Sequence, residues 1–324
     1  MVTAAVISTD NRKTALSTQL RPLELSATAD RFATVDGLRF HYREYATFST
    51  QNRPIVLLHG LASSSQIWDS VAPLLAESSR VIALDQRGHG QSDKPDTGYG
   101  FGSVVGDLDA FLRELDIERP ILVGHSWGAN VALEYAATYP GRVAGLVLVD
   151  GGLEELPSQE ETTWEQIERD MAPPDLTHFT PRELVAQVKE WEWGTFWNDQ
   201  VEAAVLSLFE VDERGKVKPR LSKTNHLRIL RAIWQQRLAT VYPTVAAPVL
   251  IVPALNTDDV EAIERKRAKV AQAEALLRST RVHWFEETYH DIPLQRPREL
   301  TAVIESFLTD RVTSGDGTAT KINP

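Results

Sequence analysis

Six short apolar runs alternate with helical patterns along most of this chain, and no other feature restricts its fold as strongly. Each run is rich in Val, Ile and Leu, which is typical of parallel strands that helices cover on both faces. Between the second and third runs, apolar residues from Val104 to Leu115 recur at the spacing of one helix face. The runs are PIVLLHG (54–60), RVIALDQ (80–86), PILVGHS (120–126), RVAGLVLVD (142–150), APVLIVPAL (247–255) and RVHWFEE (281–287). This alternation predicts an α/β fold with a mostly parallel, doubly wound sheet.

A hairpin and an insertion complete the expected organisation. Residues 32–46 have the pattern of a β-hairpin around Asp36-Gly37. The strand and helix alternation fails between about 153 and 243, where a Glu- and Trp-rich stretch predicts a helical cap over the carboxyl ends of the strands, the usual place for ligands in open α/β sheets. We expect a loosely ordered N-terminal segment at 1–30, a core at 31–152 and 244–312, a cap at 153–243 and a flexible tail at 313–324.

Five of the eight tryptophans fall within the expected cap. Residues of this kind can pack a small lid against its base, or they can form an aromatic wall for an apolar substrate. The sequence leaves both roles open for Trp164, Trp191, Trp193, Trp197 and Trp234.

Charge and residue content exclude several classes of function. A formal net charge of −11 argues against a nucleic-acid surface, and the modest basic cluster at 213–220 has the character of a solvated loop. The absence of cysteine excludes a thiolate nucleophile and thiolate metal ligands. No run approaches the length of about 18 apolar residues that a membrane span needs, and the N-terminus shows no export signal. We expect a cytoplasmic protein that acts on a small molecule without a membrane or nucleic-acid partner, and the sequence leaves homo-oligomerisation open.

The pentapeptide Gly-His-Ser-Trp-Gly at 124–128 is the most informative functional motif. It matches the G-x-S-x-G nucleophile elbow and lies between an expected buried strand and an expected helix. In such a turn the serine adopts a strained backbone conformation, and a Cβ at either flanking glycine would collide with the neighbouring chain. The strain aims the hydroxyl at the helix N-terminus, where positive potential favours a developing anion. We therefore predict that Ser126 is a nucleophile.

A serine nucleophile needs a general base, and the base needs an acid that orients it. His290 follows the last expected strand in a loop that can reach Ser126, so His290 is the expected base. The acid should lie between these two residues in the chain. Asp259 is preferred because it is closer in sequence to His290 and follows a slightly longer loop, with Asp258 as the alternative and Asp150 as a third candidate.

Two backbone N–H groups are expected to form an oxyanion hole. Trp127 directly follows the nucleophile, and Leu61 follows the strand that ends in LLHG. Each such donor contributes about 3 kcal/mol of transition-state stabilisation. This chemistry requires no metal ion and no organic cofactor.

Four segments together resemble the α/β-hydrolase superfamily across residues 32–312. They are LLHGLASSSQIW, ALDQRGHGQSDKP, VGHSWGANVALEYAATYP and HDIPLQRP. Within the superfamily, the chain is most similar to the group of meta-cleavage-product carbon–carbon hydrolases and small carboxylesterases, including monoalkyl phthalate hydrolases. Ser126 distinguishes it from haloalkane dehalogenases and epoxide hydrolases, which resemble it but use aspartate as the nucleophile. The segment LIVPALNTDD departs from the Gly-x-x-Asp that relatives usually carry after this strand, which leaves the acid open.

The expected activity is hydrolysis of a carboxylic ester through an acyl-enzyme. The Trp-rich cap indicates a small aromatic or alkyl-aromatic monoester, with a monoalkyl phthalate as the specific expectation. The alternative enzymatic hypothesis is carbon–carbon bond hydrolysis of a meta-cleavage ring-fission product by the same residues. A third hypothesis is a protein that binds a small molecule without turning it over, which the complete set of nucleophile, base and acid disfavours.

Overall fold

The computed structural model describes residues 28–45, 52–153, 156 and 162–313. The terminal segments expected at 1–30 and 313–324 lie outside these ranges except for residues 28–30 and 313. No helix in the described ranges is both long and apolar enough to cross a membrane.

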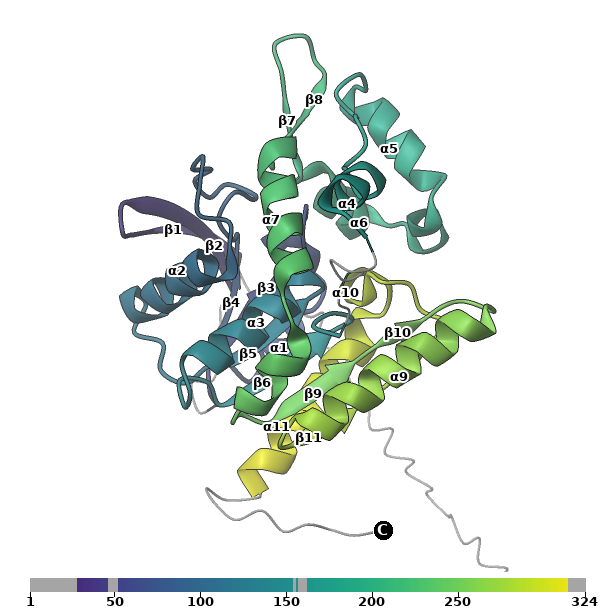
Figure 1. Ribbon diagram of the computed structural model, residues 1–324. Helices are drawn as coiled ribbons and strands as arrows, with labels where there is room; N and C mark the ends of the chain where they lie inside the picture. Colours follow the sequence, from purple (N-terminus) through teal and green to yellow (C-terminus); the bar gives the residue numbers. More distant parts are fainter. Residues whose placement is uncertain (1–27, 46–51, 154–155, 157–161, 314–324) are drawn as a thin grey trace, which may run out of the picture.

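An eight-stranded sheet forms the centre of the molecule (Figure 1). Only the β1–β2 and β2–β4 pairs are antiparallel, and the other five pairs are parallel. The prediction of a mostly parallel α/β sheet is therefore confirmed. In spatial order the strands are β1 (Thr28–Val35), β2 (Leu38–Tyr45), β4 (Val81–Leu84), β3 (Ile55–Leu58), β5 (Ile121–His125), β6 (Gly145–Val149), β9 (Val249–Val252) and β11 (Thr280–Val282).

Two of the expected strands differ in detail from the sequence pattern. The run at 247–255 divides at Pro253 into β9 and the short β10 (Ala254–Leu255). The run at 281–287 likewise divides into β11 and β12 (Phe285–Glu286). Because β10 pairs with β12 in a separate parallel sheet, the chain after β9 stays beside the loop that contains His290.

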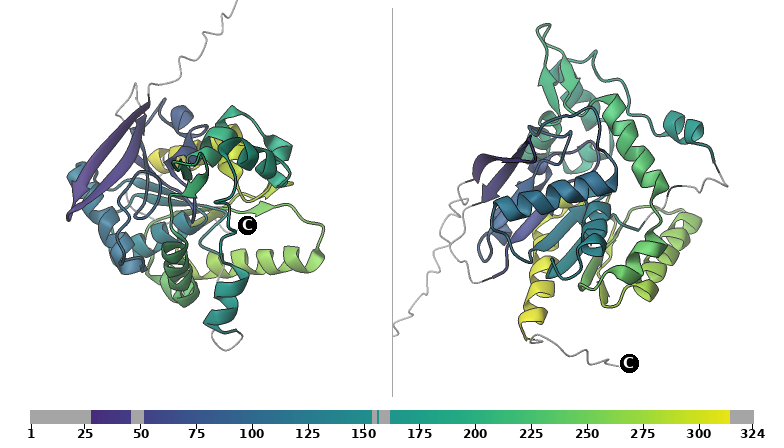
Figure 2. Two further views of the ribbon diagram at one scale, coloured as in Figure 1. Left: turned by 90° about the horizontal axis from the view of Figure 1, so that it is seen from above. Right: turned by 60° about the vertical axis from the view of Figure 1, so that its left-hand side comes forward.

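Helices cover both faces of the sheet (Figures 1 and 2). One buried cluster packs alternate strand residues such as Val56 and Leu58 against α2 (Phe101–Glu114), α3 (Trp127–Thr138), α8 (Leu238–Val241) and α9 (Val260–Leu276). The other packs residues such as Ile55 and Leu57 against α1 (Ala72–Leu75), α10 (Ile292–Gln295) and α11 (Pro297–Thr313). Short 3-10 helices occupy η1 (Ser65–Trp68) and η3 (Tyr242–Thr244). The consecutive apolar residues of each central strand thus have a core on either side.

The predicted stripe from Val104 onward is the buried face of α2, where Val104, Leu108 and Phe111 are at most 3% exposed. The predicted hairpin also forms, and its turn residues Asp36 and Gly37 both have positive φ, at 50° and 81°. A two-residue turn of this hand matches the twist of the flanking strands.

The described part of the stretch expected as a cap is rich in helices. It contains α4 (Trp164–Asp170), α5 (Pro181–Lys189), η2 (Glu192–Phe196), α6 (Asp199–Leu206) and α7 (Lys223–Gln235). Figure 1 shows α5 and α6 beyond the core, whereas α4 packs against α7 through Ile167, Leu230 and Trp234, and α7 runs back toward the core. The basic cluster at 213–220 is not simply a loop, because it supplies the turn and second strand of a small hairpin, β7 (Phe209–Val211) and β8 (Val217–Pro219).

Candidate active site

Ser126 occupies the turn between β5 and α3 in a strained conformation. Its φ is 53° and its ψ is −123°, outside the regions that L-residues favour. A Cβ added at Gly124 would lie 2.3 Å from the backbone oxygen of Gly128, and one added at Gly128 would lie 2.3 Å from that of Leu58. The two glycines are therefore required by close backbone packing. A non-glycine residue in such a conformation costs about 1–3 kcal/mol, which the surrounding structure has to supply.

His290 lines the same pocket as Ser126, and its imidazole is held by Asp150. Nδ1 of His290 lies 2.7 Å from Oδ2 of Asp150. A carboxylate can only accept a hydrogen bond, so Nδ1 carries the proton and Nε2 of the neutral ring has a free electron pair. The Asp150 side chain is 6% exposed and the His290 side chain is 47% exposed. The buried Asp150 carboxylate therefore orients an imidazole that remains open to the pocket.

The structure corrects the preference for Asp259 as the acid. Oδ1 of Asp259 accepts hydrogen bonds from the backbone N–H groups of Glu261 and Ala262, at 3.0 and 3.2 Å, so Asp259 caps α9. Asp258 is exposed in the loop that precedes α9. The chain continues from β9 into β10 before it reaches these residues, whereas Asp150 directly follows β6. The third candidate thus occupies the position beside His290, and neither of the preferred residues does.

The pair of His290 and Asp150 has shifted pKa values. Burial raises the pKa of Asp150, but the hydrogen bond and charge of His290, together with Lys266, outweigh it and lower the pKa to about 2. Burial lowers the pKa of His290, but the hydrogen bond and charge of Asp150 and the charge of Asp291 hold it above the ordinary value of 6.5. Asp150 is therefore charged across the physiological pH range, and protonation of His290 is favoured.

His125 supports the loop that contains His290. Its Nε2 donates to the backbone oxygen of His290 at 3.0 Å, and the two rings lie 4.8 Å apart. Burial and the nearby charge of His290 lower the pKa of His125 to about 4, so the ring stays neutral. The cap reaches the same loop, because Nε1 of Trp193 donates to Oδ2 of Asp291 at 2.7 Å.

Leu61 and Trp127 are the residues whose N–H groups are expected to form an oxyanion hole. Both line the pocket with Ser126. The N–H of Trp127 belongs to the first turn of α3, where helical N–H groups have no partner within the helix. Gly60 brings the preceding chain close, since a Cβ there would lie 3.0 Å from Cβ of Ser126. The two backbone segments are thus adjacent to the nucleophile.

Two buried neutral histidines shape the segment around Leu61. The N–H of Gln86 donates to Nε2 of His59 at 3.0 Å, so Nδ1 of His59 donates to the oxygen of Gly60 at 2.8 Å. The ring of His89 stacks on Trp127 with centroids 5.3 Å apart. Burial lowers the pKa of both histidines.

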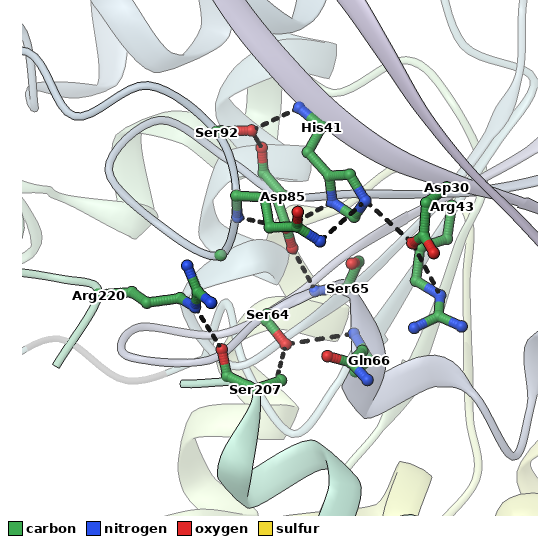
Figure 3. A network of polar contacts seen from close by, with 12 residues as sticks. Asp30, His41, Arg43, Ser64, Ser65, Gln66, Asp85, Ser92, Ser207 and Arg220 are labelled. Carbon is green, nitrogen blue, oxygen red and sulfur yellow. Dashed lines mark hydrogen bonds and ion pairs between the residues drawn. The ribbon is translucent and has the colours of Figure 1, made fainter. Parts of the chain in front are cut away.

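A further buried network, shown in Figure 3, joins this segment to the N-terminal hairpin. Nδ1 of His41, on β2, lies 2.7 Å from Oδ2 of Asp85, and both side chains are 2% exposed. Oδ1 of Asp85 accepts the N–H of Ser65 at 2.7 Å. Ser64, the next residue back, makes a 2.7 Å hydroxyl contact with Ser207 at the end of cap helix α6. Core, hairpin and cap therefore meet beside the candidate oxyanion hole.

Two cavities lie around these residues. The catalytic pocket, as we name the one that contains Ser126 and His290, has a volume of about 480 Å³ and apolar walls that include Met171, Leu230 and Ile233. The cap pocket, with a volume of about 610 Å³, is formed mainly by the cap and closed on the core side by residues such as Ala62 and His89. The two are close neighbours, because Leu61 lines one and Ala62 the other. Among the described residues, no cluster of His, Asp and Glu could hold a metal ion.

The five cap tryptophans divide between the two roles that the sequence left open. Trp191 and Trp193 line the cap pocket. Trp164 and Trp234 pack against each other at 5.7 Å in a small cluster of their own. Trp197 donates to Glu202 and stacks under Lys189.

Lys266 is the residue of this site that the sequence pattern did not reveal. Its Nζ lies 2.7 Å from Oδ1 of Asp150. It belongs to the strongly charged helix α9, in which Lys and Arg recur without any distinctive spacing. Asp150 itself offered a weak signal, because it is a single aspartate at the end of an apolar run.

Comparison with known proteins places the chain in a family. The family model described as alpha/beta hydrolase fold matches residues 53–247. A putative 2-succinyl-6-hydroxy-2,4-cyclohexadiene-1-carboxylate synthase from Bacillus subtilis is 27% identical over 277 residues, which are 85% of this chain and 96% of that protein. An uncharacterised Mycobacterium tuberculosis protein is 38% identical over 134 residues, or 41% of this chain. The chain spans only 38% of the length of that protein and of the other first curated relatives.

Solved structures agree with the fold. The crystal structure of E-2-(acetamidomethylene)succinate hydrolase superposes with a TM-score of 0.72 at 24% identity and covers 87% of this chain and all of that one. The structure of Cfl2 from Burkholderia cenocepacia gives a TM-score of 0.64 at 27% identity and covers 89% of this chain and 98% of that one. By its sequence and its fold, the chain belongs to the alpha/beta hydrolase fold family.

Proposed function

We propose that this protein is a serine hydrolase of carboxylic esters in which Ser126 is the nucleophile, His290 the base and Asp150 the acid. One observation carries the proposal: a strained serine shares a pocket with a histidine whose other ring nitrogen is 2.7 Å from a buried carboxylate. This arrangement leaves Nε2 of His290 as the proton acceptor that serine activation needs.

The acylation step follows from these positions. Oγ of Ser126 attacks the ester carbonyl carbon while its proton passes to Nε2 of His290. The N–H groups of Leu61 and Trp127 stabilise the oxyanion of the tetrahedral intermediate. The intermediate collapses when the carbon–oxygen bond to the alcohol breaks and His290 gives its proton to the departing oxygen. The acyl group remains on Ser126 as an ester.

Deacylation repeats these steps with water. His290 accepts a proton from a water molecule, which attacks the acyl carbon. The bond to Oγ then breaks and Ser126 regains its proton from His290, releasing a carboxylic acid. Asp150 stabilises the imidazolium in both halves without taking up the proton itself.

The lining of the two cavities supports an aromatic or alkyl-aromatic ester of modest size. Apolar side chains such as Met171, Leu230 and Ile233 share the lining around Ser126 with polar ones, and the neighbouring cap pocket presents Trp191 and Trp193. A monoalkyl phthalate is the specific substrate that we propose to test. Its free carboxylate lies next to the ester, so it would have to approach Lys266, the lysine among the described residues that line the catalytic pocket.

A substrate screen tests the proposal. Purified wild-type protein and Ser126→Ala are assayed for alcohol release from aryl esters, monoalkyl phthalates and lactones. We expect turnover of at least one aryl or alkyl-aromatic ester and a loss of about 10⁶-fold in kcat in the variant, as for other serine nucleophiles. Absence of ester turnover by folded wild-type protein would overturn the ester assignment.

The same screen includes a meta-cleavage ring-fission product, because carbon–carbon hydrolysis would use the same three residues. Loss of its absorbance that depends on Ser126, without ester turnover, would assign that reaction instead. Binding without turnover of any substrate would assign a ligand-binding protein.

A further inference from the structure

Lys266 brings a positive charge to the acid of the candidate site. It lies on α9, and its Nζ is 2.7 Å from Oδ1 of Asp150. The lysine side chain is 22% exposed and the aspartate side chain is 6% exposed. An ion pair with one partner this deeply buried is less screened by solvent and salt than a surface pair.

The two oxygens of Asp150 have separate partners. Oδ2 faces Nδ1 of His290, whereas Oδ1 accepts hydrogen bonds from Nζ of Lys266 and from the N–H of Ala254 at 2.9 Å. This division fixes the rotation of the carboxylate and determines which oxygen meets the imidazole. Removal of Lys266 would leave Oδ1 with one neutral donor, although charge-assisted hydrogen bonds are the stronger kind.

The charge of Lys266 also acts on His290. The titratable and charged groups around this imidazole are Asp150 after β6, Asp291 in its own loop, His125 at the end of β5, and Lys266 on α9. Burial lowers the pKa of His290, the two aspartates raise it, and Lys266 lowers it. A general base has to be neutral to accept a proton. The two carboxylates favour the protonated form of His290, and the charge of Lys266 favours the neutral form.

We propose that Lys266 is a positioning residue that orients Asp150 toward His290 and keeps His290 available as a neutral base. The proposal rests on the ester hydrolase function proposed above, because positioning matters only if His290 accepts the proton of Ser126.

Kinetics of matched variants give the first test. Lys266→Met removes the charge and keeps much of the side-chain length, and Arg267→Met removes a charge from the exposed neighbouring position on the same helix. For Lys266→Met we expect kcat near neutral pH to fall on the order of tenfold, a coupling typical of groups in one hydrogen-bonded network. We also expect the acidic limb of the pH profile to move to higher pH, with KM for an ester that carries no carboxylate nearly unchanged. Lys266→Arg should restore the limb, and Arg267→Met should behave as wild type.

Titration of His290 by nuclear magnetic resonance gives a second test that needs no turnover. The measurement uses labelled histidine in the Ser126→Ala background, with His290→Gln to assign the signal. The titration midpoint of His290 should rise in Lys266→Met and stay unchanged in Arg267→Met. If wild-type protein hydrolyses no ester, the function fails, yet this titration still decides whether Lys266 controls the imidazole.

Two results would overturn the proposal. An unchanged titration midpoint of His290 in folded Lys266→Met, confirmed with Lys266→Gln, would show that the ion pair between Lys266 and Asp150 does not affect His290. A rise in KM confined to esters that carry a carboxylate, with kcat and the pH limb unchanged, would make Lys266 a substrate-binding residue instead.

Discussion

Asp150 and Ser126 both have a positive φ, which is uncommon for residues other than glycine. Asp150 follows β6 with a φ of 42°, and Ser126 follows the neighbouring β5 with a φ of 53°. Gly151 allows the two turns to touch, because a Cβ there would lie 2.1 Å from the backbone oxygen of Ser126. Such conformations are uncommon for residues other than glycine and tend to be retained where function needs them. Two adjacent strand ends therefore present Ser126 and Asp150, the proposed nucleophile and acid, to one pocket.

Replacement of the acid gives a direct prediction. Asp150→Asn should lower kcat on the order of 10⁴-fold, because an amide cannot hold the imidazole in the tautomer that leaves Nε2 free. Asp259→Asn is the matched control, since asparagine caps a helix about as well as aspartate. Its kcat should stay near the wild-type value. Steady-state kinetics on the best ester from the screen measure both variants, and the reverse order of losses would restore Asp259 as the acid.

Sequence reasoning chose Ser126 and His290, which lie in one pocket, but it preferred Asp259 to Asp150 as their partner, and the reason is geometric. The strand ends of β6 and β9 are neighbours in the sheet, so an aspartate after either strand can lie close to a loop that follows β12. Chain separation favoured Asp259, but the β10–β12 pairing and the start of α9 place that residue at a helix N-terminus. Asp150 has a positive φ of 42° and lies 2.7 Å from His290, and no residue pattern predicts a positive φ at an aspartate.

At the scale of elements, the cap is attached to the site through specific polar contacts. Trp193 from η2 reaches Asp291, next to His290, and Ser207 at the end of α6 reaches Ser64 beside η1. The sequence predicted a helical cap, and capping residues explain its helix starts: Thr163 and Thr180 each form a capping box. Contacts between cap and core depend on tertiary packing, which a local pattern does not encode.

The contact of Trp193 with Asp291 predicts a measurable coupling between the cap and the base. Trp193→Phe keeps an aromatic ring but removes the donor, and a hydrogen bond to a charged group contributes about 1.5–3 kcal/mol. We expect kcat/KM to fall on the order of tenfold, with a small change in melting temperature. Trp164→Phe, which alters the small cluster with Trp234 and lines neither pocket, is the control and should change kcat/KM little. Equal effects of the two substitutions would show that the contact with Asp291 has no particular role.

At the scale of the whole molecule, the pH dependence of activity should reflect His290. The neighbouring aspartates hold the pKa of this histidine above 6.5 even though burial lowers it. The proposed base is the neutral form of His290. As the pH rises, His290 loses its proton, so kcat/KM should increase through a midpoint above 6.5 and be low at pH values below that midpoint. A pH–rate profile on a neutral ester measures this limb. A midpoint below 6.5 would contradict the charge arrangement around His290.

The N-terminal hairpin is joined to the rest of the core by a buried ion pair that should make stability depend on pH. His41 lies between Asp85 and Asp30, at 2.7 and 3.0 Å. Burial lowers the pKa of His41, but the hydrogen bonds and charges of the two aspartates raise it above 6.5. Burial raises the pKa of Asp85, but its bonds to His41 and Ser65 and nearby histidine charges lower it. At pH values between the ordinary pKa values of aspartate and histidine, His41 is therefore positively charged and Asp85 is negatively charged.

The stability that this pair contributes should have a defined pH window. A histidine with a raised folded-state pKa stabilises the fold fully below its unfolded value near 6.5, and this contribution is lost as pH rises through the folded-state value. His41→Gln should lower the free energy of unfolding by about 3–5 kcal/mol near pH 6, because it leaves Asp85 charged and buried without its partner. The difference from wild type should shrink as the pH rises above 6.5 and the wild-type imidazolium loses its proton.

Urea unfolding at several pH values measures this difference, with His178→Gln as the control because His178 is exposed in the cap. The control should follow wild type at every pH. If the destabilisation by His41→Gln stays constant across the range, the histidine acts by packing alone and is not charged in the folded protein. A difference that grows with pH would mean that the neutral ring is the stabilising form, since only that form gains population as pH rises.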